Sequence, residues 1–124
     1  MKILGIGVDI VDNFRIKSSL KNKLFIKRIF TSNEILLTKN IKNKTSYYSK
    51  RFAAKEALSK SIGIGFRNGL NFNDISVIND KLGKPSFVIT DKIKKIIKRK
   101  FKTSSFNFFL SISDEKKYSI AYVI

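Results

Sequence analysis

The feature that most constrains the fold is a long helical pattern in the middle of the chain, between segments that have the pattern of strands. From Ser46 to Ile62 apolar residues recur every three or four positions, and Gly63 follows where helices commonly end. Near the N-terminus, over residues 2–11, and near the C-terminus, over residues 106–112 and 118–124, apolar residues alternate, which is typical of strands. The last two segments are separated by a short turn and predict a hairpin.

Shorter elements fill the rest of the 124-residue chain. Thr31 and Glu34 have the spacing of a capping box at the start of a helix. No repeat, low-complexity linker or break in composition divides the sequence. We therefore expect one domain over residues 1–124, of α+β class, in which a largely antiparallel sheet packs against the long helix. The remaining predicted elements are helices over residues 13–22, 24–30, 31–37 and 93–101, strands over 75–79 and 86–90, and a turn at Asn68–Gly69.

The first predicted strand has two unlike faces. Leu4, Ile6, Val8 and Ile10 share one face, whereas Gly5, Gly7 and Asp9 share the other. Two glycines beside an acid leave room for a ligand to approach the backbone. The same glycines are equally expected where a strand packs closely against a helix, so this stretch by itself does not decide between the two.

The chain contains neither cysteine nor histidine. This excludes disulfides, thiolate metal sites, a cysteine nucleophile, zinc sites with the usual ligands and catalytic triads built on imidazole. Carboxylates, lysines, hydroxyls and a hard, oxygen-bound cation remain. The N-terminal residues resemble neither a signal peptide nor a membrane span, so we expect a cytoplasmic protein with no membrane partner.

The chain is strongly basic, with 26 Lys and Arg against 9 Asp and Glu, a net charge of +17. A positive field attracts polyanions and acidic proteins and speeds encounter with them. A nucleotide bias in the coding sequence would fill surface positions with lysine equally well. The charge by itself therefore does not identify a partner.

One face of the long helix carries Phe52, Glu56 and Lys60 at intervals of four residues. A Glu four residues before a Lys is most often a helix-stabilising surface pair that contributes about 0.2–0.5 kcal/mol. Small residues on the flanks of this helix and the glycines after it leave space for a ligand beside the pair. A functional site is therefore a second interpretation of Glu56 and Lys60.

Two longer motifs make the chain resemble the holo-acyl-carrier-protein synthase family, within the 4'-phosphopantetheinyl transferase superfamily. Gly5–Val11 (GIGVDIV) and Lys50–Lys60 (KRFAAKEALSK) carry most of the likeness. Further matching segments follow in the family's order, so the resemblance covers nearly the whole chain. They are residues 28–34, 63–69, 79–85 and 111–114.

The resemblance implies a fold and a reaction. The fold is that of the 4'-phosphopantetheinyl transferases. The activity is Mg²⁺-dependent transfer of 4'-phosphopantetheine from coenzyme A to a serine of apo acyl carrier protein, releasing 3',5'-ADP, in support of fatty acid biosynthesis. Asp9 and Glu56 would bind the metal, and together with Lys60 they would be the catalytic residues. The family likeness also implies a homotrimer with an active site at each subunit interface.

By the same resemblance, the residues near coenzyme A would be Arg51, Phe52, Lys60, Lys84 and Pro85. Phe52 is also well suited to the core, and Lys84–Pro85 to a simple turn.

Arg15, Lys21 and Arg28 lie near the family's docking positions and could pair with an acidic carrier protein. One departure concerns Asp114, where family members often carry a histidine. A proton-transfer role of that histidine cannot be assumed here. Asp114 could orient a water or the acceptor serine, or could be a turn residue.

Two alternatives to an enzyme remain. The basic segment 92–102 and the aromatic residues Phe106, Phe108 and Phe109 are compatible with a nucleic-acid-binding module. However, the alternation of Phe106 and Phe108 with Leu110 is more typical of a core strand, so nucleic acid is not the expected partner. A scaffold that has lost catalysis is disfavoured because both carboxylates and Lys60 are present.

Overall fold

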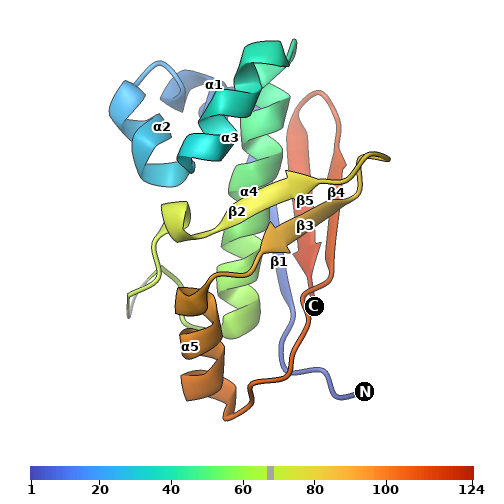
Figure 1. The fold of residues 1–124 in the computed structure, drawn as a ribbon. Coiled ribbons are helices and arrows are strands. Elements are labelled where there is room, and N and C mark those ends of the chain that lie inside the picture. The colour runs from blue at the N-terminus through green and yellow to red at the C-terminus, as the bar shows by residue number, and fades with distance from the viewer. Residues whose placement is uncertain (67–68) are drawn as a thin grey trace.

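The computed structural model describes residues 1–66 and 69–124 (Figure 1), so Asn68 of the predicted Asn68–Gly69 turn lies outside the described residues. None of the described helices is long and apolar enough to cross a membrane. The elements, in chain order, are β1 (Gly7–Asp12), α1 (Asn13–Ser19), α2 (Lys23–Ile29), α3 (Ser32–Leu37), the short 3-10 helix η1 (Thr38–Asn40), α4 (Lys44–Ile62), the 3-10 helix η2 (Phe72–Asp74), β2 (Ser76–Asn79), β3 (Pro85–Val88), α5 (Asp91–Phe101), β4 (Leu110–Asp114) and β5 (Tyr118–Val123).

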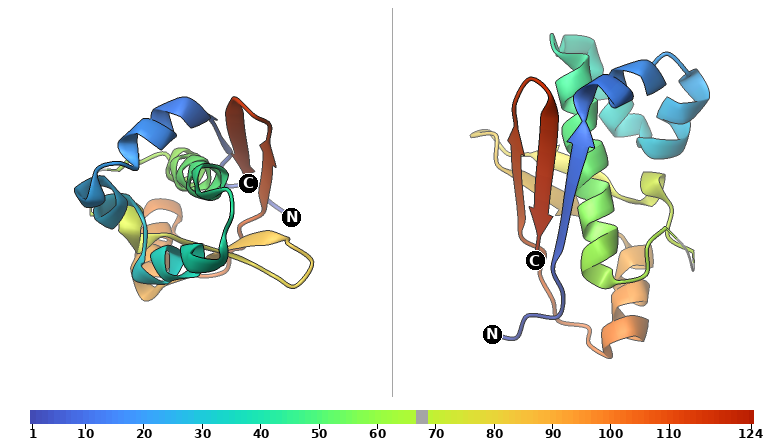
Figure 2. Two further views of the ribbon diagram at one scale, coloured as in Figure 1. Left: turned by 90° about the horizontal axis from the view of Figure 1, so that it is seen from above. Right: turned by 180° about the vertical axis from the view of Figure 1, so that it is seen from behind.

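The predicted α+β class is confirmed, and α4 is its central element. A three-stranded antiparallel sheet of order β1-β5-β4 lies along one side of α4, and the hairpin β2–β3 forms a separate two-stranded sheet. Helices α1 to α3 surround the N-terminal half of α4, whereas α5 lies beside its C-terminal end (Figures 1 and 2). The first strand and the C-terminal hairpin therefore join one sheet across the long helix, as the alternation predicts.

Several boundaries differ from the predictions. The first strand begins at Gly7 rather than residue 2, and the first strand of the C-terminal hairpin begins at Leu110 rather than residue 106. Helix α4 begins at Lys44, two residues before the predicted start, because the Asn43 side chain caps it by accepting from the Ser46 amide. Its end at Gly63 is as predicted, with the left-handed φ of 83° that favours glycine.

The two glycines of the first strand allow β1 to lie directly against α4. A Cβ atom added to Gly5 would lie 1.9 Å from the Ser61 carbonyl oxygen, and one added to Gly7 would lie 2.0 Å from the Ala57 carbonyl oxygen. Such distances are far inside van der Waals contact, so any side chain would push the strand away from the helix. Of the two explanations for the glycines, close packing of a strand on a helix is the one that these contacts support.

The sheet turns its small side chains toward α4 and its large apolar side chains outward. Ala121 and Val123 on β5 are completely buried beneath the sheet, together with Ser119. The outer face remains exposed in a single chain; its members include Val8 (52% exposed), Ile10 (60%), Ile120 (40%) and Tyr122 (40%). Register pairs Val8 with Tyr122 and Ile10 with Ile120, so these residues form one continuous surface, which we call the outer sheet face.

Candidate active site

Asp9 and Lys60 meet where β1 crosses α4. Asp9 follows Gly5 and Gly7 on the inner face of the strand, so its carboxylate points toward the helix. The Lys60 ammonium lies 3.1 Å from Asp9 Oδ1 and donates a second hydrogen bond of 3.0 Å to the Val8 carbonyl. The Asp9 side chain is 15% exposed and that of Lys60 is 53% exposed, so the pair is partly open to solvent.

Glu56 lies one helical turn before Lys60. We call Asp9, Glu56 and Lys60 together the carboxylate cluster. Burial raises the pKa of Glu56, the negative charge of Asp9 raises it further, and Lys60 opposes both effects. Burial likewise raises the pKa of Asp9, against the stabilising hydrogen bond and charge of Lys60. Asp9 is therefore close enough to disfavour the ionised form of Glu56, an arrangement that a bound cation would relieve.

The donor set fits magnesium better than other metals. Within residues 1–66 and 69–124 no group of three or more His, Cys, Asp or Glu side chains could enclose an ion. Mg²⁺ commonly binds through one or two carboxylates and completes its octahedron with waters and substrate phosphates. Asp9 and Glu56 match this requirement, with Lys60 available beside them for a phosphate.

Phe52 lies one turn before Glu56 and belongs to a row of aromatic rings. Its ring stacks on Phe72 at a centroid distance of 5.3 Å and on Phe25 at 6.3 Å. Phe72 in turn stacks on Phe66 at 3.6 Å. Phe52 is only partly buried, so it serves the packing of this row and also keeps an accessible edge.

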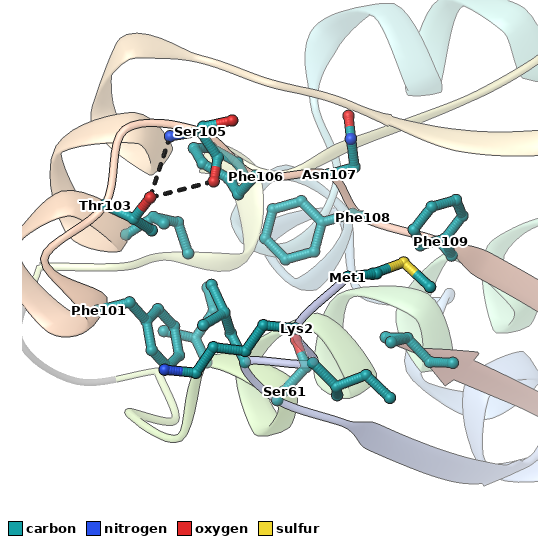
Figure 3. Close-up of a pocket in the computed structure, with 16 residues that line it drawn as sticks. Met1, Lys2, Ser61, Phe101, Thr103, Ser105, Phe106, Asn107, Phe108 and Phe109 are labelled. Atoms are coloured by element: carbon teal, nitrogen blue, oxygen red, sulfur yellow. Dashed lines mark hydrogen bonds between the residues drawn. The ribbon is translucent and has the colours of Figure 1, made fainter.

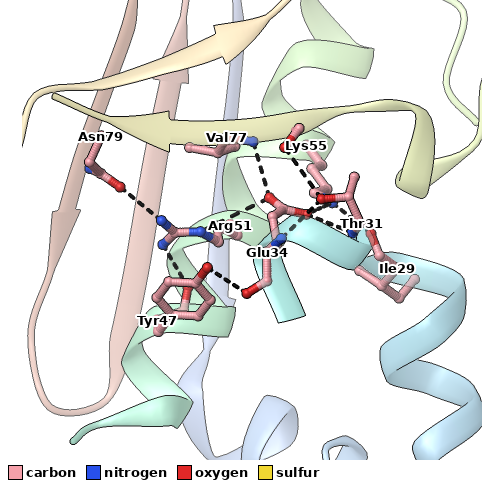
Figure 4. Close-up of polar contacts among 9 residues, drawn as sticks. Ile29, Thr31, Glu34, Tyr47, Arg51, Lys55, Val77 and Asn79 are labelled. Atoms are coloured by element: carbon pink, nitrogen blue, oxygen red, sulfur yellow. Dashed lines mark hydrogen bonds and ion pairs between the residues drawn. The ribbon is translucent and has the colours of Figure 1, made fainter. Parts of the chain in front are cut away.

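Arg51 is buried, and its side chain points toward Tyr47 and Asn79 (Figure 4). Its guanidinium donates to the Tyr47 carbonyl at 3.3 Å and to Asn79 Oδ1 at 2.8 Å, and it covers the Tyr47 ring at 3.6 Å. The Arg51 side chain is only 8% exposed, and burial lowers its pKa from the ordinary value. Arg51 thus contacts other partners than Asp9, Glu56 and Lys60, although it shares α4 with Glu56 and Lys60.

Lys84 and Pro85 lie at the end of the turn between β2 and β3. This turn projects from the body of the chain, away from α4 (Figures 1 and 2). In the described part of the chain, no hydrogen bond or ion pair joins Lys84 to Asp9, Glu56 or Lys60. A single subunit therefore does not bring this turn to the carboxylate cluster.

The three predicted docking cations are exposed on the helical layer. Arg15 lies on α1, Arg28 on α2, and Lys21 in the connection between them. Exposed Phe14 and Leu24 lie on the same two helices. This surface combines positive charge with apolar side chains, the composition expected of a docking site for an acidic partner.

Asp114, Phe106 and Phe108 make contacts within this chain, whereas Phe109 is 57% exposed. Asp114 Oδ2 accepts a 2.7 Å hydrogen bond from the Ser46 hydroxyl, which ties β4 to the first turn of α4. Phe106 and Phe108 pack against the core and contact each other edge-to-face at 5.6 Å. Stacking on nucleic-acid bases would need free ring faces, so these two residues do not support the nucleic-acid alternative.

An apolar cavity of about 650 Å³ lies away from the carboxylate cluster (Figure 3). Its walls come from residues 1–5, the end of α4, α5 and the connection over residues 103–109. None of the residues predicted to bind metal, coenzyme or carrier protein lines it. The predicted site is thus a partly open cluster on the β1–α4 contact instead of an enclosed pocket.

Sequence reasoning missed the buried pair of Glu34 and Lys55. The Lys55 ammonium donates to Glu34 Oε1 at 2.6 Å, and both side chains are completely buried. The capping-box spacing identified Glu34 only as a helix-start residue. The one available signal for Lys55 is its place in the run of alanines that packs beneath the sheet.

Comparison with known proteins shows one family. The sequence model of the 4'-phosphopantetheinyl transferase superfamily matches residues 5–123. The chain is 78% identical to the holo-[acyl-carrier-protein] synthase of Pelagibacter ubique over 124 residues, which cover 100% of this chain and 97% of the relative.

Solved structures agree with the sequence match. The crystal structure of the Neisseria meningitidis holo-[acyl-carrier-protein] synthase matches with a TM-score of 0.88 and 36% identity, covering 98% of this chain and 97% of that chain. The Bacillus anthracis synthase, solved in complex with CoA (3',5'-ADP), matches with a TM-score of 0.80 and 36% identity, covering 98% and 94%. The resemblance of Gly5–Val11 and Lys50–Lys60 to this family is thereby confirmed, and the chain belongs to the holo-[acyl-carrier-protein] synthases of the 4'-phosphopantetheinyl transferase superfamily.

Proposed function

We propose that this protein transfers 4'-phosphopantetheine from coenzyme A to a serine of an apo acyl carrier protein, with release of 3',5'-ADP, in support of fatty acid biosynthesis. The observation that carries the proposal is the cluster of Asp9, Glu56 and Lys60 at the β1–α4 contact. It occurs in a chain that is 78% identical to a holo-[acyl-carrier-protein] synthase. The family and the site chemistry thus support the same reaction.

The reaction exchanges one bond to phosphorus for another. The serine oxygen bonds to the β-phosphorus of coenzyme A, the serine proton is released, and the bond to the oxygen of the departing 3',5'-ADP breaks. Negative charge grows on the leaving phosphate, so positive groups beside it lower the barrier. We assign this task to Lys60, and the position of its ammonium beside Asp9 supports the assignment.

Asp9 and Glu56 are the proposed ligands of Mg²⁺. The bound ion would neutralise charge on the phosphate oxygens during transfer. The effect of Asp9 on Glu56 supports this assignment, because the negative charge of Asp9 raises the pKa of Glu56 and a bound cation would offset that charge.

The coenzyme would contact residues from two neighbouring subunits. Phe52 and Lys60 lie on α4 beside the carboxylates, whereas Lys84 and Pro85 lie on a turn that projects away from them. We assign all four to the coenzyme site, the turn being supplied by an adjacent chain. For Arg51 a direct contact with the nucleotide stays a prediction.

A homotrimer would explain both the projecting turn and the outer sheet face. That face exposes a contiguous set of large apolar side chains, which monomeric proteins rarely leave uncovered. We propose that the trimer buries it and completes three active sites. Arg15, Lys21 and Arg28 would remain outside, where they can pair with an acidic carrier protein.

The test is release of 3',5'-ADP, measured by chromatography after incubation of the protein with coenzyme A, Mg²⁺ and an apo acyl carrier protein. We expect release only when all components are present. A carrier protein whose acceptor serine is replaced by alanine is the control and should give none. If a known synthase releases the nucleotide under the same conditions while this protein does not, the proposal is wrong.

A further inference from the structure

We infer that Arg51 is a positioning residue, which holds the β2–β3 turn in place through Asn79 and thereby sets the affinity for coenzyme A. The inference rests on the proposed function, because the turn carries Lys84 and Pro85. The Arg51 guanidinium donates to the Asn79 side chain (Figure 4). The Asn79 amide in turn donates to the backbone of the turn at Gly83, so a continuous chain of hydrogen bonds runs from α4 to that turn.

The Arg51 side chain is held in a fixed position. Its guanidinium stacks on the Tyr47 ring, and the Tyr47 hydroxyl in turn donates a 2.7 Å hydrogen bond to the Glu34 carbonyl. Arg51 Nε lies 4.0 Å from Glu34 Oε2. A buried arginine held on an aromatic ring and beside a carboxylate has little rotamer freedom, so it offers a rigid donor to whatever lies at its tip.

The same carboxylate holds strand β2. Glu34 Oε2 accepts from the Val77 backbone amide at 3.0 Å, while Glu34 Oε1 accepts from the Lys55 ammonium. Strand β2 is thus attached to the α3–α4 interior at Val77 and again, two residues later, at Asn79. These two attachments fix the direction in which the strand delivers the turn.

Asn79 passes the constraint on to the turn. Its Oδ1 accepts from Arg51 Nη2 at 2.8 Å, and its Nδ2 donates to the Gly83 carbonyl at 2.9 Å. Because arginine can only donate and a carbonyl can only accept, the amide has one orientation that satisfies both partners. Loss of either bond would free the amide to rotate and would loosen its hold on Gly83.

The turn itself is closed by Asp80. Its Oδ1 accepts from the Leu82 and Lys84 amides, each at 2.9 Å, and Gly83 has the left-handed φ of 89° that completes the bend. The backbone of Lys84 is therefore fixed while its side chain stays exposed. Among residues 1–66 and 69–124, no hydrogen bond or ion pair engages the Lys84 ammonium, so it is available to an external anion.

This arrangement gives α4 two separate tasks. Its Phe52–Glu56–Lys60 face serves the site on the same subunit, whereas Arg51 supports a turn proposed to serve the adjacent subunit. If Arg51 instead contacted the nucleotide directly, removal of Asn79 would not change the effect of replacing Arg51. The two possibilities therefore differ in whether the residues are energetically coupled.

The experiment measures KM for coenzyme A and kcat in Arg51→Lys, Asn79→Ala and the double variant. We expect each single change to raise KM up to about 10-fold, the effect of one or two hydrogen bonds, with kcat retained within about twofold. The double variant should be little worse than either single one. Asn79→Asp keeps an acceptor for Arg51 but loses the donor to Gly83, so it should also raise KM.

Asn73→Ala is the matched control, because Asn73 is an exposed asparagine on η2 outside this hydrogen-bond chain, and it should leave KM unchanged. Two results would overturn the inference while the wild-type protein remains active. One is a KM increase in the double variant equal to the product of the two single increases; the other is an unchanged KM in Asn79→Ala and Asn79→Asp. An inactive wild-type protein would instead refute the proposed function. If Arg51→Lys fails to fold, the variants at the exposed residue Asn79 still test the inference through their KM for coenzyme A.

Discussion

The Lys60 ammonium lies 3.1 Å from Asp9 Oδ1 and joins the C-terminal half of α4 to strand β1. The lysine thus neutralises part of the charge of a carboxylate that burial alone would disfavour. A cation held by Asp9 and Glu56 would take over this neutralisation. Lys60 would then be free to turn its ammonium toward a phosphate.

Replacing either carboxylate should abolish transfer and its dependence on magnesium together. In Asp9→Asn and Glu56→Gln one of the two proposed metal ligands loses its charge, so the remaining carboxylate should no longer retain the ion. The measurement is a magnesium titration of the initial rate. Glu115→Gln, a change to an exposed glutamate in the β4–β5 turn, is the control. Full activity with an unchanged magnesium response in either variant would contradict the assignment.

Lys60→Met should lower kcat more than it weakens the binding of coenzyme A. A group that stabilises charge developing during the reaction typically contributes a factor of about 10²–10³ to kcat. The split is measured by steady-state kinetics alongside calorimetric titration with the coenzyme. Lys95→Met, on the exposed side of α5, should change neither quantity. A variant that lost only binding, with kcat intact, would reduce Lys60 to an affinity residue.

Gly7→Ala should destabilise the fold by about 3 kcal/mol, the upper end of the usual cost of overpacking, because its Cβ would lie 2.0 Å from the Ala57 carbonyl oxygen and the strand would have to move off the helix. Urea denaturation measures the loss. Gly65→Ala is the comparison: its Cβ would meet no atom within 4 Å, so only the left-handed φ of 62° carries a cost, about 1–2 kcal/mol. Equal losses in the two variants would show that close packing of β1 on α4 is unimportant.

Lys55→Met should cost about 3–5 kcal/mol of unfolding free energy, since it leaves the fully buried Glu34 carboxylate without its closest cation. Pairing it with Glu34→Gln should recover part of the loss, because the Glu34 carboxylate charge that lost its lysine is then removed as well. Chemical denaturation of the two single variants and the double variant tests this. Strictly additive losses would mean that the pair is not coupled.

Ile120→Glu should dissociate the proposed trimer, because it places a charge at the centre of the outer sheet face. Sedimentation velocity reports the change directly, and activity should fall with it. Lys98→Glu, on α5, introduces the same negative side chain outside the outer sheet face and should leave the assembly intact. A wild-type protein that sediments as a monomer would refute the trimer at once.

The sequence patterns predicted the elements better than their orientation. Alternation correctly placed Val8 and Ile10 on one face of the first strand, but it does not say which face turns inward. The small side chains of Gly7 and Ala121 decide this, because only they allow the sheet to approach α4. Large apolar residues consequently face outward, which alternation along one chain does not reveal.

The candidate site was predictable in part. The spacing of Glu56 and Lys60 on one helix face follows from helical geometry, and the family likeness brought in Asp9 from a distant strand. The interior position of Arg51 could not be foreseen, because its guanidinium donates to Asn79 on β2 and its Nε lies 4.0 Å from Glu34 Oε2 on α3. Such long-range partners arise only when the hairpin packs against α3 and α4.

The central claim is tested most directly by the intact mass of an apo acyl carrier protein after incubation with coenzyme A, Mg²⁺ and either the wild-type protein or Asp9→Asn. The account predicts that the wild-type reaction adds the mass of one phosphopantetheine group to the acceptor serine. The Asp9→Asn reaction should leave the carrier protein unmodified. An unmodified carrier protein with the wild-type enzyme, or full modification with the variant, would contradict it.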